Sequence, residues 1–224
     1  MPLPSCFCVI LCERLKMSNV RLVWSTPNGQ EHIAYMARVS NPNNQSNPDY
    51  EKLIRYLVKH QHWSPFEMVN LCMEIETTRD IARQILRHRS FTFQEFSQRY
   101  AEVSNFDVSL ARLQDHTNRQ NSLETNDKEL KKVWHEYQHD VIRKANTVYT
   151  WALNAGIAKE VARKVLPEGL TMSRMYMNGT LRSWMHYVTI RCSKDTQKEH
   201  RDVAMKCKDI LTEQFPIVMK AFNG

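Results

Sequence analysis

The segment VNLCMEIETTRDIARQILRHR, residues 69–89, contains the clearest change of hydrophobic period in the chain. Over residues 69–76 apolar and polar side chains alternate, which is the period of a β-strand with one buried face. Thr78 can then cap a short helix whose apolar positions are Ile81, Ile85 and Leu86. The segment therefore predicts a strand followed directly by a helix, with the basic triplet of residues 87–89 at or just past the end of that helix.

Outside this segment the chain predicts more helix than strand. Further strands are expected around residues 20–24 and, more weakly, at residues 170–177. Helices are expected at residues 47–60, 127–155, 156–165, 181–191 and 198–214. The polar, poorly periodic residues 101–126 indicate a long loop. Because strands and helices do not alternate regularly, we predict an α+β fold: a helix-rich single domain with a small mixed or antiparallel sheet and no Rossmann fold.

The first residues differ from the rest in composition. Residues 2–12 are apolar but lack a basic segment before them and a small-residue cleavage site after them, and they are too few to span a bilayer. Met17 is followed directly by the strand-like residues. We therefore expect residues 1–16 to be an appendage outside the fold, residues 17–224 to form the functional domain, and the protein to have no membrane partner.

Composition limits the class of ligand. The 224 residues carry a formal net charge of +7, which favours anionic partners. The basic residues form no dense block, which favours local anion pockets over a long polynucleotide track. The six cysteines form no CxxC pair and no Cys/His cluster with zinc spacing, so reduced thiols, a cytoplasmic location and no metal site are expected.

Phosphate binding by a glycine-rich loop is excluded. With only five glycines, neither GxGxxG nor a Walker loop can be written anywhere in the chain. A bound phosphate must therefore be held by side chains, and arginine suits this because its planar fork bonds phosphate bidentately. The candidates are Arg87, Arg89, Arg99, Arg163, Arg182 and Arg191.

Residues 87–100 combine cations, a carboxylate and a hydroxyl with four interleaved aromatic residues. Such a mixture can bind a ligand that is both flat and anionic. From the residues alone, three interpretations remain open: a solvated helix end with surface ion pairs, a nucleic-acid-binding patch, and a nucleotide or cofactor pocket.

The spacing in this segment resembles a known family. Arg87-His88-Arg89, seven residues and then Ser97 is similar to the signature of flavin-dependent thymidylate synthases. Further similarities follow the family's order: HWSPFE at residues 62–67, Gln84 three residues before Arg87, RKVLP at 163–167, NGTLRS at 178–183, and Arg191 followed by Gln197 and Glu199. Together they cover about residues 20–205.

The resemblance implies a methyltransferase that converts dUMP to dTMP by reductive methylation. The methylene group comes from 5,10-methylenetetrahydrofolate, and hydride is delivered through tightly bound FAD that NADPH has reduced. It also implies a homotetramer with shared active sites, no cysteine nucleophile and no nucleic-acid partner. The alternatives are a basic nucleic-acid-binding protein and a flavoprotein that has lost methyl transfer.

The same resemblance implies roles for individual residues. Arg191 is expected to be catalytic, polarising the uracil ring. The expected dUMP contacts are Gln84, Arg87, Glu95, Ser97, Gln98, Arg99, Arg163 and Arg191. The expected FAD contacts are His62, Ser64, Arg87, His88, Arg89, Glu95, Asn178, Arg182 and His186.

Overall fold

The fold is built on a four-stranded antiparallel sheet. The computed structural model describes residues 18–223, so the predicted appendage of residues 1–16 lies outside the described residues. The strand order is β1 (Asn19–Ser25), β2 (Asn70–Thr78), β6 (Met172–Thr180) and β3 (Thr92–Glu95), and all three pairings are antiparallel. The predicted α+β class with a small sheet is confirmed, and of the two sheet types expected the antiparallel one is present.

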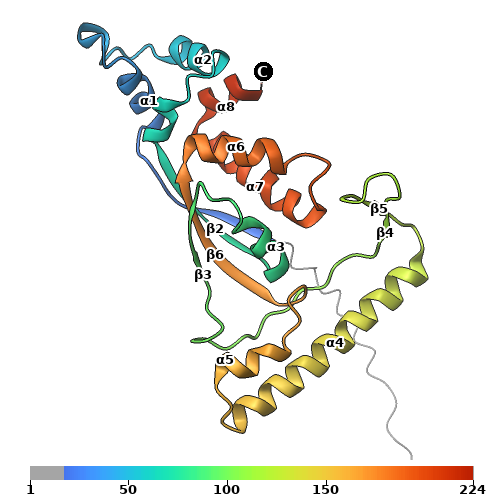
Figure 1. Cartoon of the computed structure of the whole chain (residues 1–224). Coiled ribbons are helices and arrows are strands. Elements are labelled where there is room, and N and C mark those ends of the chain that lie inside the picture. Colours follow the sequence, from blue (N-terminus) through green and yellow to red (C-terminus); the bar gives the residue numbers. More distant parts are fainter. Residues whose placement is uncertain (1–17, 224) are drawn as a thin grey trace, which may run out of the picture.

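The helices and the remaining short elements complete the chain. The helices are α1 (Gly29–Ala37), α2 (Glu51–Lys59), α3 (Arg79–Ile85), α4 (Lys128–Asn154), α5 (Lys159–Ala162), α6 (Leu181–Arg191), α7 (Lys198–Gln214) and α8 (Pro216–Asn223). Three short 3₁₀ segments, η1 (Pro42–Asn44), η2 (Ser64–Met68) and η3 (Arg163–Val165), and a hairpin of β4 (Arg112–Gln114) and β5 (Ser122–Glu124) lie between them. Figure 1 shows α3, α6 and α7 beside the sheet, with α4 and α5 beyond the opposite end of β6 from α6.

Two expectations about strands need correction. The predicted loop of residues 101–126 contains the β4–β5 hairpin, which cross-strand pairs such as Arg112 with Glu124 hold together. The strand at 170–177, expected to be weak, is a nine-residue central strand that pairs with both β2 and β3. Its inward residues Ser173, Met175 and Met177 alternate with exposed ones, so the strand period is present although its apolar residues are mostly methionines.

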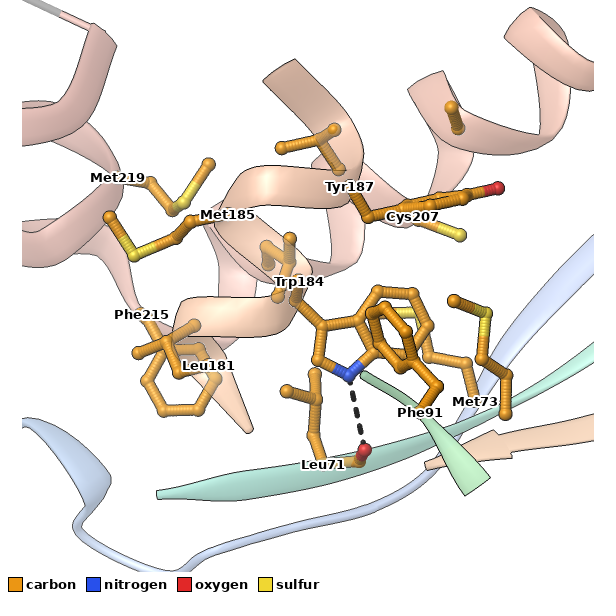
Figure 2. Close-up of a cluster of buried hydrophobic side chains, with 14 of the residues drawn as sticks. Leu71, Met73, Phe91, Leu181, Trp184, Met185, Tyr187, Cys207, Phe215 and Met219 are labelled. Atoms are coloured by element: carbon orange, nitrogen blue, oxygen red, sulfur yellow. Dashed lines mark hydrogen bonds between the residues drawn. The ribbon is translucent and has the colours of Figure 1, made fainter. Parts of the chain in front are cut away.

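The main core lies between the sheet and helices α6, α7 and α8. Trp184 of α6 is fully buried, and its indole Nε1 donates a hydrogen bond of 3.2 Å to the carbonyl oxygen of Leu71 on β2 (Figure 2). Phe91 packs edge-on against Trp184, with ring centroids 4.9 Å apart. A tryptophan that fills the core and satisfies a strand carbonyl fixes how α6 lies on the sheet.

Helix ends only partly follow the predicted caps. The Thr180 side chain accepts from the Ser183 backbone N–H at the start of α6, as predicted, and Asp127 caps α4 in the same way. Thr78 stands at the N-cap of α3, but its side chain makes no capping hydrogen bond, so that expectation is wrong. A backbone hydrogen bond is made there instead, in which the Arg79 N–H donates to the carbonyl oxygen of Thr171.

Helix α4 packs outside the main core. A second, smaller apolar cluster forms where Tyr149, Ala152 and Ala162 meet Val103 and Phe96. Tyr149 also accepts a hydrogen bond from the Val103 backbone N–H. The segment after β3 is thereby fixed onto α4 and α5. No helix within residues 18–223 is long and apolar enough to cross a membrane.

Candidate active site

The RHR triplet lies in a series of tight turns between α3 and β3, as predicted. The backbone N–H of Arg87 bonds the carbonyl of Gln84, that of His88 bonds Ile85, and that of Phe91 bonds His88. These turns leave Arg87 and Arg89 exposed and direct His88 inward, where it lies edge-on to Tyr187 with ring centroids 5.0 Å apart. The triplet therefore presents two cations to solvent and one imidazole to the core.

His88 and Arg191 are joined directly. The Nε of Arg191, the last residue of α6, donates to the Nε2 of His88 at 2.8 Å. Burial, together with the positive charge of Arg191, lowers the pKa of His88 to about 4, so the imidazole is neutral at physiological pH. Because a guanidinium can only donate, His88 must accept at Nε2 and carry its proton on Nδ1.

Gln84 belongs to the same buried group. His200 of α7 is fully buried, lies 6.3 Å from the His88 ring centroid, and contacts the side chains of both Gln84 and Tyr187. We call Gln84, His88, Tyr187, Arg191 and His200 the histidine cluster. It brings together two predicted dUMP contacts, Gln84 and Arg191, with one predicted FAD contact, His88.

A cavity of about 560 Å³ opens beside η2 and α6. Arg182 and His186 line it, and Trp63 and Phe222 add aromatic walls. His62 and Ser64, also predicted FAD contacts, are exposed next to the lining residue Trp63. Arg182 forms an ion pair with Glu67, which fixes η2 to α6.

Asn178 on β6 has a buried side-chain oxygen that finds no hydrogen-bond partner within residues 18–223. Its amide nitrogen donates to the Thr92 hydroxyl at 3.3 Å, whereas its Oδ1 is buried and bonds nothing among the described residues. An orphaned acceptor costs free energy unless a ligand satisfies it. Together with the Arg182 guanidinium and the aromatic walls of the cavity, it fits a ligand such as FAD, which combines a flat ring system carrying N–H groups with a pyrophosphate.

The remaining predicted contacts lie at the other end of β3. Glu95 is the last residue of that strand, with its carboxylate 2.9 Å from the Ser173 hydroxyl and 3.5 Å from Arg79. Ser97 and Arg99 follow in a turn, where the Arg99 guanidinium lies 5.3 Å from the Tyr100 ring centroid. Within one chain, β3 therefore separates these residues from the RHR triplet by roughly 13 Å of strand.

Gln98 and Arg163 belong to this second group. Gln98 is buried, and its Nε2 has no partner among residues 18–223. Arg163 begins η3, where its Nε donates to the Glu160 carbonyl. Lys159, nearby in α5, binds the Tyr100 carbonyl and pairs with Glu102, so the segment after Ser97 lies against α5. We call Ser97, Gln98, Arg99 and Arg163 the distal group.

The described cysteines are poor nucleophiles. Cys72 lies in β2, as predicted, and burial raises the pKa of its thiol and of the Cys192 thiol. Cys207 is fully buried, and burial raises its thiol pKa far above the usual range. Since the thiolate is the reactive form, none of the three is activated. Within residues 18–223, no three or more His, Cys, Asp or Glu side chains are placed to hold a metal ion.

Two positions in the cluster were not anticipated from the sequence. His200 lies on the apolar face of α7 with Val203, Ala204, Cys207 and Leu211, all fully buried. A histidine at such spacing signals a buried, hydrogen-bonded ring, and this signal was available. No such signal marks Tyr187, because an aromatic residue on an apolar helix face usually only fills the core.

This chain is similar to known proteins over most of its length. A family model described as thymidylate synthase complementing protein matches residues 21–217. The flavin-dependent thymidylate synthase of Synechocystis sp. is 51% identical over 191 residues, which cover 85% of this chain and 88% of that protein. A probable flavin-dependent thymidylate synthase of Paramecium bursaria Chlorella virus 1 is 47% identical over 196 residues, covering 87% of this chain and 90% of that protein.

A solved structure shares the fold. The UMP/dUMP methylase PolB from Streptomyces cacaoi, bound with 5-Br dUMP, superposes with a TM-score of 0.81 at 28% identity. The match covers 92% of this chain and 94% of the methylase. The extent of the family match and the identity to the Synechocystis enzyme show that this chain belongs to the thymidylate synthase complementing protein family, the flavin-dependent thymidylate synthases.

Proposed function

We propose that the chain converts dUMP to dTMP with 5,10-methylenetetrahydrofolate as carbon donor, NADPH as reductant and FAD as bound cofactor. The observation that carries the proposal is the direct bond between Arg191 and His88 beside Gln84, in a chain whose relatives are flavin-dependent thymidylate synthases. The methylase neighbour was solved with a dUMP analogue, which supports dUMP as the substrate.

Arg191 is the proposed catalytic residue. Its Nε is committed to His88, while its terminal guanidinium nitrogens make no hydrogen bond among the described residues. They can donate to the carbonyl edge of a uracil ring and stabilise negative charge as it develops there. Neutral His88 holds the plane of the guanidinium without adding a competing charge. This preorganisation lowers the barrier for activating the ring carbon that receives the methylene group.

The flavin is proposed to bind where cations, aromatic walls and the orphaned Asn178 oxygen meet. Arg182 and His186 at the cavity, with exposed Arg87 and Arg89, would hold its phosphates. Bound FAD supplies the hydride, which it receives from NADPH. In the proposed overall reaction the methylene carbon would break its bonds to the folate nitrogens, which releases tetrahydrofolate, and would form a bond to the ring carbon of dUMP. One hydride would complete the methyl group, and the proton of that ring carbon would be lost.

The distal group and Glu95 are proposed to bind dUMP from another subunit. Arg99 and Arg163 provide charge for the phosphate, and Ser97 and Gln98 provide neutral donors. Buried Gln98 Nε2 lacks a partner among the described residues, which supports a ligand there. Because β3 separates this group from Arg191 within a chain, we propose that a homotetramer brings the two parts together.

The test is a dTMP assay with purified full-length protein, dUMP, methylenetetrahydrofolate and NADPH. The protein should be yellow, its flavin absorbance should be bleached by NADPH and restored by air, and dTMP should form only with all three substrates. Flavin reduction without dTMP would indicate a flavoprotein that lacks methyl transfer. A colourless protein with salt-dependent polynucleotide affinity would overturn the proposal.

A further inference from the structure

A chain of hydrogen bonds passes through the Gln84 side chain and joins three helices. The Tyr187 hydroxyl lies 3.1 Å from His200 Nε2, and His200 Nδ1 lies 3.3 Å from Gln84 Oε1. Gln84 Nε2 lies 2.7 Å from Gln197 Oε1, and Gln197 Nε2 lies 3.1 Å from Glu199 Oε2. We call these five side chains the amide relay.

One end of the amide relay has fixed polarity. Burial raises the pKa of Glu199, but its hydrogen bonds, including that from Arg112, lower it more, and the net pKa is below the usual value. The carboxylate is therefore ionised and can only accept hydrogen bonds. Arg112 Nη2 pairs with the other carboxylate oxygen of Glu199, Oε1, at 2.6 Å. Both oxygens of Glu199 therefore have a partner.

This polarity determines every other bond. Gln197 must turn its amide nitrogen to Glu199 and its oxygen to Gln84. Gln84 must then give its nitrogen to Gln197 and its oxygen to His200, so that His200 carries its proton on Nδ1. The remaining lone pair on His200 Nε2 accepts from the Tyr187 hydroxyl. A single direction of donation thus runs from Tyr187 to Glu199.

His200 keeps this polarity over the working range of pH. Its ring is fully buried, and burial, with the positive charge of Arg191, lowers its pKa to about 3. A neutral imidazole has one donor and one acceptor, which is the pair that Gln84 and Tyr187 require. The charged and titratable groups around it, His88, Arg191 and Tyr187, do not compete for Gln84 in any hydrogen bond among residues 18–223.

Resting on the proposed function, we infer that His200 is a positioning residue for dUMP, which locks the Gln84 amide so that it meets the nucleotide in one orientation only. A locked amide offers the ligand one remaining N–H and one remaining lone pair in fixed places. An unlocked amide can rotate by half a turn and exchange donor for acceptor. His200 is thus expected to act on nucleotide affinity without touching the nucleotide.

Two substitutions of equal polarity separate positioning from simple burial. In His200→Asn the amide nitrogen falls near the position of Nδ1 and can still donate to Gln84. In His200→Gln the amide lies near the position of Nε2, so the contact with Tyr187 is kept and that with Gln84 is lost. Both variants place an amide in the same buried site, so their costs in stability are comparable.

The readouts are dUMP affinity, measured by calorimetry on the flavin-loaded protein, and the KM for dUMP. His200→Asn should stay within about threefold of wild type. His200→Gln should weaken dUMP binding about tenfold, as expected for one misdirected hydrogen bond, with flavin content unchanged. In a Gln84→Ala background, His200→Gln should cause no further loss, because the group it positions is absent.

A variant of Gln197 keeps the inference testable if the variants of buried His200 fail to fold. Gln197 is only half-buried, and Gln197→Met removes the acceptor for Gln84 with little change in volume. It should weaken dUMP binding in the same direction as His200→Gln. Equal losses of dUMP affinity in His200→Asn and His200→Gln would overturn this inference but not the proposed function. Full dUMP affinity in both His200→Gln and Gln197→Met would do the same. Wild-type protein that binds no dUMP would overturn the proposed function and this inference with it.

Discussion

Arg191 is oriented through its Nε by His88, and this geometry makes its contribution testable. Arg191→Ala should lower the rate of dTMP formation about 10²–10³-fold, because one preorganised donor to the developing charge is removed. Flavin content should stay near wild type, since Arg191 is not among the lining residues of the cavity beside η2. Steady-state dTMP assays and the flavin-to-protein absorbance ratio measure both effects.

Arg191→Lys is the matched control for charge. Lysine keeps the cation but lacks a planar fork, so it cannot bind His88 and a uracil edge in one plane. An intermediate rate is therefore expected. Wild-type dTMP synthesis by Arg191→Ala would refute the proposed catalytic role.

His200 also predicts how stability depends on pH. Its folded pKa of about 3 lies below the ordinary value of 6.5. Between these values the unfolded chain binds a proton that the folded chain does not, so stability falls as pH falls through this window. At pH 5 the loss from His200 is about 2 kcal/mol relative to neutral pH. His88, with a folded pKa of about 4, adds in the same direction.

Urea unfolding at pH 7 and pH 5 measures this loss. His200→Asn should lose less stability between the two pH values than wild type does, because asparagine does not titrate. The carboxylates and His88 are common to both proteins and cancel in the comparison. An equal or larger loss in the variant would contradict the buried neutral state of His200.

At the scale of elements, β6 approaches the turn before β3 closely enough to require glycine. A Cβ on Gly179 would meet the Phe91 ring at 2.4 Å, and that ring is fixed against Trp184 (Figure 2). Gly179→Ala should therefore destabilise the protein by about 1–3 kcal/mol through overpacking. Gly169→Ala is the control, because no atom lies within 4 Å of its Cβ position. It should change stability by less than about 0.5 kcal/mol.

Denaturant midpoints at constant m-value measure both alanine variants. Two similar midpoints would show that Phe91 can move away without cost. In that case the close approach of Phe91 would not require glycine at position 179.

The elements predicted correctly are those whose side chains repeat with one period over many residues. The strand at 69–76 and the helix from Asp127 are of this kind. The strand Thr92–Glu95 was missed because four residues give too short a period, and its pairing with β6 is a tertiary contact. The helix Gly29–Ala37 was missed because it begins after Asn28 in the left-handed conformation, without a side-chain cap.

The motif named candidate site residues, which stay predictions, but it could not give their contacts. The motif identified His88 and Arg191, which are 103 positions apart, but no local pattern shows that they share a hydrogen bond. The β4–β5 hairpin was hidden for a related reason. Its links to Asp195, Lys198 and Glu199 are polar contacts with a distant segment. Sequence periodicity reports burial, and these contacts lie at the surface or between charges.

At the scale of the whole molecule, the arrangement of the site predicts its assembly. One chain places Arg191 in the histidine cluster through its bond to His88, which precedes β3, whereas Ser97 of the distal group follows the end of β3 at Glu95. Figure 1 shows the course of β3. If one active site takes these two parts from different subunits, an isolated chain cannot be active. Light scattering should give four times the chain mass of 26.5 kDa for the flavin-loaded enzyme. A flavin-loaded, active monomer would exclude shared sites.

Subunit complementation tests the same arrangement directly. Arg191→Ala damages the histidine cluster and Ser97→Ala damages the distal group, so each homo-oligomer alone should form little dTMP. After the two variants are mixed under conditions that exchange subunits, some sites receive both intact parts, and activity should rise well above that of either variant. Mixing Arg191→Ala with an Arg191→Lys variant is the control, because no site regains arginine. Absence of any rise, with subunit exchange verified by mass-tagged chains, would show that each site is built from one chain.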